Sequence, residues 1–161
     1  MQHDIRTFEP GDAESVVALI LGIQRDEFGF DVTAADQPDL LEIPAFYQTG
    51  RGEFWVALAG DRIVGTIALK EMEDDAGALR KMFVAADHRG VAQGVAQALL
   101  DTLIDHARRS GLRTIYLGTT ERFRAAHRFY EKNGFRVVRG DDLPASFPRM
   151  NVDTRFYRID L

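Results

Sequence analysis

The feature that most constrains the fold of this chain is a β-α-β unit in its second half. Leu79 to Ala85 is an apolar run typical of a buried strand. Gly94 to Ser110 repeats apolar residues every fourth position, which predicts an amphipathic helix. A further strand is predicted over Thr114 to Leu117. Two strands joined by such a helix run parallel with a right-handed crossover, so we expect a parallel pair within the sheet.

The elements around this unit predict antiparallel pairing. Apolar runs over 54–59 and 63–69 flank Gly60-Asp61, a pattern typical of a hairpin. Further strands are predicted over 5–8, 135–138 and 152–159, and helices over 12–28, 40–48 and 121–133. The order βααβββαβαββ predicts one α/β domain over residues 1–161, with a mixed sheet and helices on both faces.

Composition argues against several classes of protein. The chain has no cysteine, which excludes disulfides, thiolate metal sites and a cysteine nucleophile, and its three later histidines are too dispersed to suggest a metal site. A net charge of -5 with scattered arginines argues against nucleic-acid binding, which usually needs a basic face. The longest apolar stretch, Val16 to Ile23, is too short for a membrane span, and the N-terminus has no secretory pattern, so we expect a cytoplasmic protein.

The loop between the predicted strand and helix has the features of an anion site. Gly90, Ala92, Gly94 and Ala96 are small, so a phosphate could approach the backbone closely. The start of a helix adds free N–H groups and the positive end of its dipole. The loop lacks both the lysine of a P-loop and the Rossmann glycine pattern. The alternative is that small residues only let the helix pack on its strand, and the glycines alone leave both interpretations open.

This loop resembles motif A of the GNAT superfamily of acetyl-CoA-dependent N-acetyltransferases, the Arg/Gln-x-x-Gly-x-Gly/Ala loop that follows the fourth strand. Gly94-Val95-Ala96 matches its end, and Arg89 stands two residues earlier than in the common spacing. Ala126 to Phe135 resembles the family's Ala-x-x-x-Tyr-Glu-Lys-x-Gly-Phe signature, and Tyr116 to Thr120 resembles its fifth strand. The resemblance spans most of the chain and implies the GNAT fold, a mostly antiparallel sheet splayed between strands four and five.

The resemblance implies where acetyl-CoA binds as a cosubstrate, without a metal. The pyrophosphate would lie on the loop after strand four, and the pantetheine arm on the exposed edge of that strand, where a main-chain N–H polarises the thioester carbonyl. Phe123 replaces an asparagine common in the family and could pack on this arm. The implied contacts are Met82, Phe83, Val84, Arg89, Gly90, Val91, Ala92, Gln93, Gly94, Val95, Ala96, Gln97, Thr119 and Phe123.

Tyr130 occupies the tyrosine position of the family signature, which implies a proton donor for the leaving CoA thiolate. The alternative is that Tyr130 is only a core aromatic of an amphipathic helix. A glutamate that some relatives carry at the start of strand four is missing here. The candidates for the base that deprotonates the amine are a water chain or one of Glu71, Glu73, Glu27 and Asp31. For each carboxylate the alternative is plain solvation, Glu71 and Glu73 standing in a predicted acidic loop over 71–77.

The acceptor site is implied to lie between the first two helices and the last hairpin. Glu27, Phe28, Glu71 and Phe147 are the candidate contacts, and the segment from Leu143 to Met150 is expected to border the pocket. Aromatic and acidic residues there would suit a cationic amine with an apolar part, or the aromatics only seal the core edge.

We therefore expect acetyl transfer to the primary amine of a small molecule, by direct attack on the thioester. The alternatives are acetylation of a protein N-terminus or lysine, and a non-catalytic acyl-CoA sensor. Family analogy makes a homodimer possible.

Overall fold

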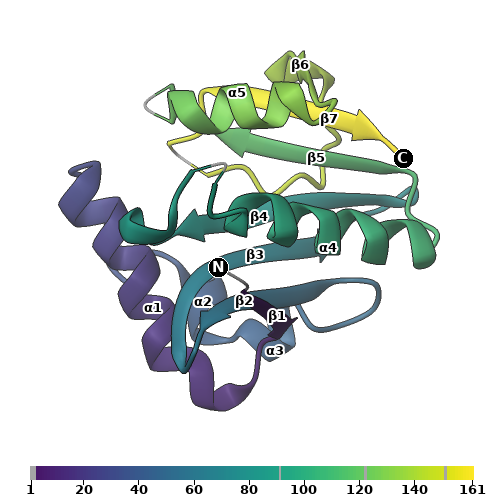
Figure 1. The fold of residues 1–161 in the computed structure, drawn as a ribbon. Helices are drawn as coiled ribbons and strands as arrows, with labels where there is room; N and C mark the ends of the chain where they lie inside the picture. The colour runs from purple at the N-terminus through teal and green to yellow at the C-terminus, as the bar shows by residue number, and fades with distance from the viewer. Residues whose placement is uncertain (1–2, 91, 122, 151) are drawn as a thin grey trace.

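The computed structural model describes residues 3–90, 92–121, 123–150 and 152–161. Seven strands form one sheet in the order β1-β2-β3-β4-β5-β7-β6 (Figure 1). Neighbouring strands are antiparallel, except that β4 and β5 are parallel, so the predicted mixed sheet is confirmed. The strands are β1 (Asp4–Thr7), β2 (Glu53–Ala59), β3 (Arg62–Glu71), β4 (Ala76–Val84), β5 (Thr114–Thr119), β6 (Arg136–Val138) and β7 (Arg155–Asp160).

The helices follow the predicted order with one difference. They are α1 (Ala13–Gly22), α2 (Pro38–Leu41), α3 (Ile43–Phe46), α4 (Val95–Arg109) and α5 (Arg124–Lys132). The predicted helix over 40–48 is replaced by α2 and α3, which are separated at Glu42. Pro44 explains the break, because its ring lacks an N–H and would collide with the carbonyl four residues earlier. After α1, a π-helical turn continues through Ile23–Glu27.

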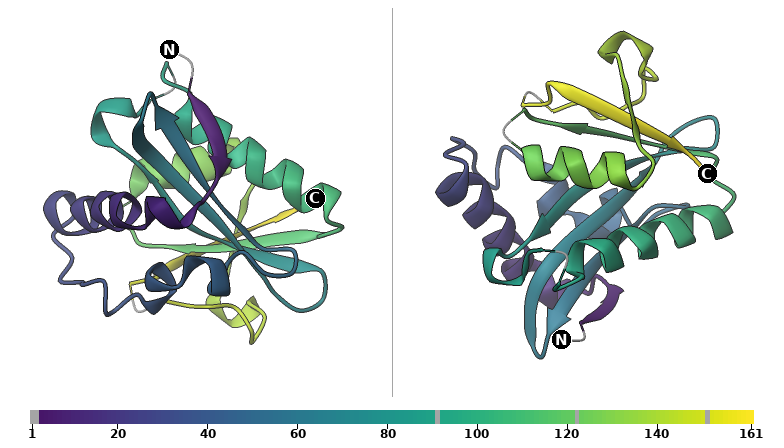
Figure 2. Two further views of the ribbon diagram at one scale, coloured as in Figure 1. Left: turned by 90° about the horizontal axis from the view of Figure 1, so that it is seen from below. Right: turned by 45° about the horizontal axis from the view of Figure 1, so that its top comes forward.

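The helices cover the two faces of the sheet. One face carries α4 and α5, and the other carries α1 to α3 together with the segment between β6 and β7 (Figure 2). Gly65 of β3 lets α4 pack closely, since a Cβ there would lie 3.0 Å from a Leu99 methyl and 3.1 Å from a Val95 methyl. This close approach fixes the first turn of α4 near the end of β4. None of the helices in the described part of the chain has the length and apolarity that a membrane span requires.

The parallel contact between β4 and β5 is short. It consists of three residue pairs, from Ala76 opposite Thr114 to Ala78 opposite Tyr116. Beyond these pairs β5 continues against β7 as far as Thr119, while β4 continues against β3 as far as Val84. The expected splay between strands four and five is therefore confirmed.

Candidate functional site

The residues predicted for the cosubstrate lie where β4 and β5 part. The N–H of Ala85 donates to the Val64 carbonyl of β3 at 2.8 Å. Alternate residues of a strand direct their backbone groups to opposite edges, so the N–H of Val84 points toward the opening. Thr119 stands at the end of β5, the strand that forms the other side of the opening. Of the neighbouring predicted contacts, Met82 packs toward α4, and Phe83 packs toward α1.

The loop from β4 to α4 is shaped by two glycines in left-handed conformations. Gly90 has φ 104° and Gly94 has φ 70°, and glycine adopts such values without strain. The Gly90 carbonyl accepts the N–H groups of Gln93 at 3.1 Å and of Gly94 at 3.3 Å, which closes the loop. Ala92 is exposed, and Val91, the remaining predicted contact, lies outside the described residues.

The first turn of α4 presents backbone N–H groups to the solvent side of this loop. Gly94 is the N-cap, and the Ala98 N–H donates back to its carbonyl at 3.0 Å. The N–H groups of Val95, Ala96 and Gln97 therefore belong to the first turn, where a helix has no carbonyl to offer them. These donors and the positive end of the helix dipole have the features of an anion site, and the site itself stays a prediction.

The side chains of this turn leave the N–H groups accessible. The Val95 side chain is buried in the core, and Ala96 carries only a methyl group. The Gln97 amide donates to Asp101 and to Asn133, both at 2.9 Å, so it ties α4 to the end of α5.

Arg89 and Glu27, predicted as contacts of the cosubstrate and the acceptor, bind each other. The two terminal nitrogens of Arg89 donate to the two oxygens of Glu27 at 2.5 and 2.8 Å, and its Nε donates to the Val84 carbonyl at 2.8 Å. This bidentate pair joins the π-helical turn after α1 to the end of β4. The Arg89 side chain thus fixes the loop from the side of the first helix.

Tyr130 of α5 reaches across to β4. Its side chain is buried, and its hydroxyl lies 3.6 Å from the sulfur of Met82. Its ring packs against those of Phe135 at 5.6 Å and Tyr157 at 5.9 Å. Burial raises the pKa of the Tyr130 phenol, so the hydroxyl keeps its proton at neutral pH. The ring is therefore a core aromatic, while the hydroxyl points to β4, and its role as a proton donor stays a prediction.

Phe123 and Phe28, predicted for different ligands, belong to one aromatic cluster. Their ring centres lie 4.4 Å apart in an edge-to-face arrangement. Phe30 completes the cluster, 6.0 Å from Phe123 and 6.2 Å from Phe28. The cluster joins the end of the first helical region to the start of α5, so it links the two halves of the sheet.

Lys81, which no sequence motif singles out, is turned into the protein interior by a bulge in β4. The register against β3 shifts between Thr66 and Ala68, and Lys81 has φ 53°. Its side chain is only 2% exposed, and its Nζ donates to the Gln37 amide oxygen at 2.6 Å and lies 3.6 Å from an Asp39 oxygen. The only signal in the sequence is the charged pair Arg80-Lys81 inside an apolar strand.

Tyr47, Gln24 and Asp153 belong to the same cluster. Asp39 accepts the Tyr47 hydroxyl at 2.6 Å, and Gln37 exchanges hydrogen bonds with Gln24 at 2.8 and 3.1 Å. Burial raises the pKa of Asp153, while the nearby positive charges of Arg80, Lys81 and Arg149 oppose that rise. The cluster lies on the face covered by α1 to α3, opposite the first turn of α4.

Because Lys81 is buried, we expect its contribution to the stability of the protein to rise with pH above neutrality. Burial lowers its pKa from 10.5 to about 8, against the opposing charge of Asp39. Between these pKa values the unfolded chain binds a proton that the folded chain does not. The free energy of unfolding should therefore increase by about 2 kcal/mol from pH 8 to pH 10, and this stabilisation is lost as the pH falls through 8. Urea denaturation at constant ionic strength measures it.

Lys81→Met removes the titrating group and should abolish the rise, whatever its effect on stability at pH 7. A wild-type protein whose stability changes between pH 8 and pH 10 in the same way as that of Lys81→Met would contradict a buried Lys81.

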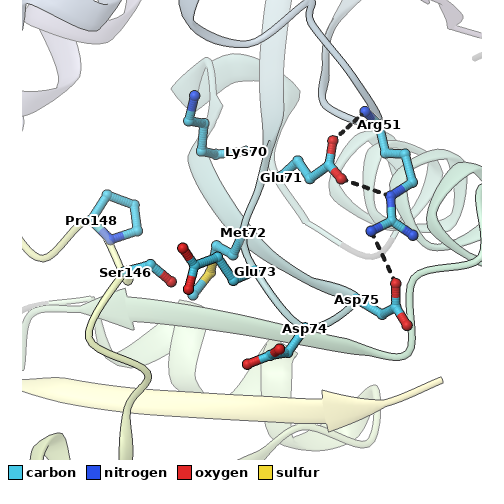
Figure 3. Close-up of a pocket in the computed structure, with 9 residues that line it drawn as sticks. All are labelled: Arg51, Lys70, Glu71, Met72, Glu73, Asp74, Asp75, Ser146 and Pro148. Atoms are coloured by element: carbon cyan, nitrogen blue, oxygen red, sulfur yellow. Dashed lines mark hydrogen bonds and ion pairs between the residues drawn. The ribbon is translucent and has the colours of Figure 1, made fainter.

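A cavity of about 580 Å³ opens on the same face, near the paired ends of β4 and β5. Figure 3 shows Ser146 and Pro148 facing Met72 and Glu73 across it. Glu71, a candidate base, belongs to β3 rather than to the predicted loop over 71–77. It accepts the Arg51 N–H at 2.7 Å and the Arg51 Nε at 2.8 Å, and these bonds lower the pKa of Glu71. Its carboxylate thus has a structural partner in this structure.

Phe147 lies on this face as well. With Leu143 it packs on Met72, Ala76, Ala78 and Tyr116, the cluster that covers the start of β4 and β5. The ring of Phe147 also meets that of Phe156, 6.2 Å away. The segment between β6 and β7 therefore lies on the face that bears the Lys81 cluster. Within the described residues, no group of three or more histidine, aspartate or glutamate side chains could hold a metal ion.

Comparison with known proteins gives a consistent result. The sequence profile of the Acetyltransferase (GNAT) family matches residues 18–135, which include both motifs described above. N-acetylaspartate synthetase of Danio rerio is 39% identical over 126 residues, which cover 75% of this chain and 44% of that protein. This chain spans about half the length of the curated relatives it matches.

Solved structures agree with the fold. A GNAT-family acetyltransferase from Staphylococcus aureus Mu50 superposes with a TM-score of 0.95 at 38% identity, and the match covers 99% of each chain. The N-acetyltransferase PaiA of Thermoplasma acidophilum, solved in complex with coenzyme A, has a TM-score of 0.74 at 17% identity, with 100% of each chain covered. The second match supports the fold alone.

Proposed function

The chain belongs to the GNAT acetyltransferase family, and we propose that it transfers an acetyl group from acetyl-CoA to the primary amine of a small molecule. One observation carries the proposal. The open first turn of α4, the outward N–H of Val84 and the Tyr130 hydroxyl all meet the last residues of β4. Along β4, the helix turn would bind an anion, the Val84 N–H would donate to a carbonyl, and the Tyr130 hydroxyl would act as an acid.

In this proposal the first turn of α4 binds the diphosphate of coenzyme A. The backbone from Gly90 to Gln97 surrounds the phosphates, and Gly90, Ala92, Gly94 and Ala96 leave room for them. The pantetheine arm runs along the open edge of β4, with Thr119 and Phe123 on its other side. The Arg89–Glu27 pair holds the loop in place rather than meeting the phosphates through its side chain.

The chemical step is direct transfer. The neutral amine attacks the thioester carbonyl carbon, a C–N bond forms, and the C–S bond breaks with its electron pair leaving on sulfur. A backbone N–H on the open edge of β4 stabilises the negative charge on the carbonyl oxygen. The Tyr130 hydroxyl protonates the CoA thiolate and recovers its proton from solvent. Glu27 and Glu71 are both bound to arginines, so in this proposal water, rather than either of these carboxylates, carries away the proton that the amine loses.

The acceptor approaches from the face that bears α1 to α3 and the segment before β7. Phe28 and Phe147 lie on its route, whereas the cavity beside Glu71 lies at the paired ends of β4 and β5, away from Tyr130. A small acceptor is supported by the 39% identity to an enzyme named for the synthesis of N-acetylaspartate.

Two measurements on the wild-type protein test this proposal. Isothermal titration should show binding of acetyl-CoA, and an assay of free CoA thiol should show turnover with small amines. Binding without turnover on amines and peptides alike would favour an acyl-CoA sensor, and turnover on peptides alone would favour a protein acetyltransferase. A protein that binds neither acetyl-CoA nor CoA would contradict the assignment.

A further inference from the structure

Two adjacent cations of β4 share one face of the sheet. Thr66 pairs with Phe83 and Ala68 pairs with Arg80, so one residue of β3 stands opposite two residues of β4. Such a bulge interrupts the alternation of side chains. Arg80 lies over the Phe46 ring of α3 at 5.6 Å, and Lys81 bonds to Gln37 just before α2. Both cations therefore point to the face of α1 to α3.

These two cations differ in their partners. Lys81 is bound to Gln37 and faces Asp39. The half-buried Arg80 guanidinium has no hydrogen bond and no ion pair with any residue of the described segments. A guanidinium presents five N–H donors, and a partly buried one without acceptors is unfavourable unless a ligand or water supplies them. Its planar fork matches both oxygens of a carboxylate.

The local charge favours an anion. The positive charges of Arg80, Lys81 and Arg149 interact with Asp153. The carboxylates that interact with Lys81 are Asp153 and Asp39. Three positive side chains thus face two carboxylates, in a chain whose net charge is -5. Lys70 adds a fourth cation over the same Phe46 ring, at 4.4 Å.

The position of Arg80 relates this charge to the reaction. Arg80 stands two residues before Met82, whose sulfur meets the Tyr130 hydroxyl. Because Arg80 points to the face of α1 to α3 and Met82 packs toward α4, an acceptor held by Arg80 would reach the thioester through the opening where β4 and β5 part.

Resting on the function proposed above, we propose that Arg80, supported by Lys81, binds the carboxylate of the acceptor. The acceptor is then an amine that carries a carboxylate a few bonds from its nitrogen. A cationic amine, which the acidic and aromatic residues of the sequence favoured, would instead meet three like charges at this point.

Matched amines test the proposal. The acids are glycine, β-alanine, 4-aminobutyrate, L-aspartate and L-glutamate. Their neutral counterparts are glycinamide, β-alaninamide, 4-aminobutanamide and the diamides of L-aspartate and L-glutamate, and putrescine is a cationic amine without a carboxylate. With acetyl-CoA and the wild-type protein, kcat/KM for the preferred acid should exceed that for its amide by about 10- to 100-fold, because a buried charged hydrogen bond is lost in the amide.

Arg80→Gln should reduce this acid-to-amide ratio to near one, through a raised KM for the acid, while the Kd of acetyl-CoA stays unchanged. Arg80→Lys, which keeps the charge without the fork, should give an intermediate ratio. Arg109→Gln is the matched control, because Arg109 is 73% exposed and pairs with Asp105 of its own helix, and it should keep the wild-type ratio.

Several results would overturn the carboxylate subsite. They are equal or faster turnover of amides or putrescine, an acid preference that survives in Arg80→Gln, and binding of acetyl-CoA without acetylation of any acid in the panel. If Arg80→Gln does not fold, the acid-to-amide ratios of the wild-type protein and of Arg80→Lys still test the carboxylate subsite. Turnover of amides alone would leave the acetyltransferase function standing, whereas loss of acetyl-CoA binding by the wild-type protein would remove both proposals.

Discussion

Replacing Tyr130 with phenylalanine should lower kcat by about 100-fold, the usual contribution of a positioned general acid. The ring and its contacts with Phe135 and Tyr157 remain, so the fold should be preserved. Within the described residues, the hydroxyl has one hydrogen bond, the weak one to the Met82 sulfur at 3.6 Å. The Kd of acetyl-CoA should therefore change little. Single-turnover kinetics separates the chemical step from product release.

Tyr157→Phe is the matched control for this experiment. Tyr157 is also buried, its ring lies 5.9 Å from that of Tyr130, and its hydroxyl binds Glu131 at 2.6 Å rather than facing β4. This variant should keep kcat close to the wild-type value. A Tyr130→Phe protein with unchanged kcat would show that the thiolate takes its proton from another group.

Ala96→Asp should weaken the binding of acetyl-CoA by about 100-fold or more. Ala96 lies in the first turn of α4, where the negative charge of an aspartate interacts favourably with the helix dipole, so the substitution should preserve the fold. A carboxylate about 5 Å from one phosphate charge, at an effective dielectric constant near 20, repels it by about 3 kcal/mol. Isothermal titration with CoA and with dephospho-CoA measures the loss.

Ala96→Asn has nearly the same shape without the charge, and it should retain most of the affinity. An Ala96→Asp protein that binds acetyl-CoA as the wild type does would place the diphosphate away from this turn. The salt dependence gives a second readout, because repulsion between exposed charges weakens as ionic strength rises.

Local patterns were enough to predict most of the fold. The hairpin of β2 and β3 and the unit from β4 through α4 to β5 follow from short-range periodicity, and a parallel pair needs a helical crossover. The split between α2 and α3 at Glu42 replaces the single helix predicted over 40–48, because the apolar pattern continues through the proline that breaks the helix.

The functional site was harder to predict, because its contacts join distant segments. The Arg89–Glu27 pair links residues far apart in the chain, and each had been assigned to a different ligand. The inward turn of Lys81 depends on the register between β3 and β4, which the sequence of β4 alone does not determine. By contrast, Tyr130 and Met82 were both expected at the site, and the topology brings them into contact.

The three residue pairs between β4 and β5 have a consequence for how the molecule is held together. They form the main backbone contact between two parts of the sheet, the four strands β1 to β4 and the three strands β5, β7 and β6. Beyond these pairs, the edge of β4 that faces β5 has no neighbouring strand. A ligand with peptide-like amides could form hydrogen bonds to this edge, as a neighbouring strand does. Cosubstrate binding would then connect the two parts of the sheet, so the free protein and its acetyl-CoA complex should differ in rigidity most between β4 and β5.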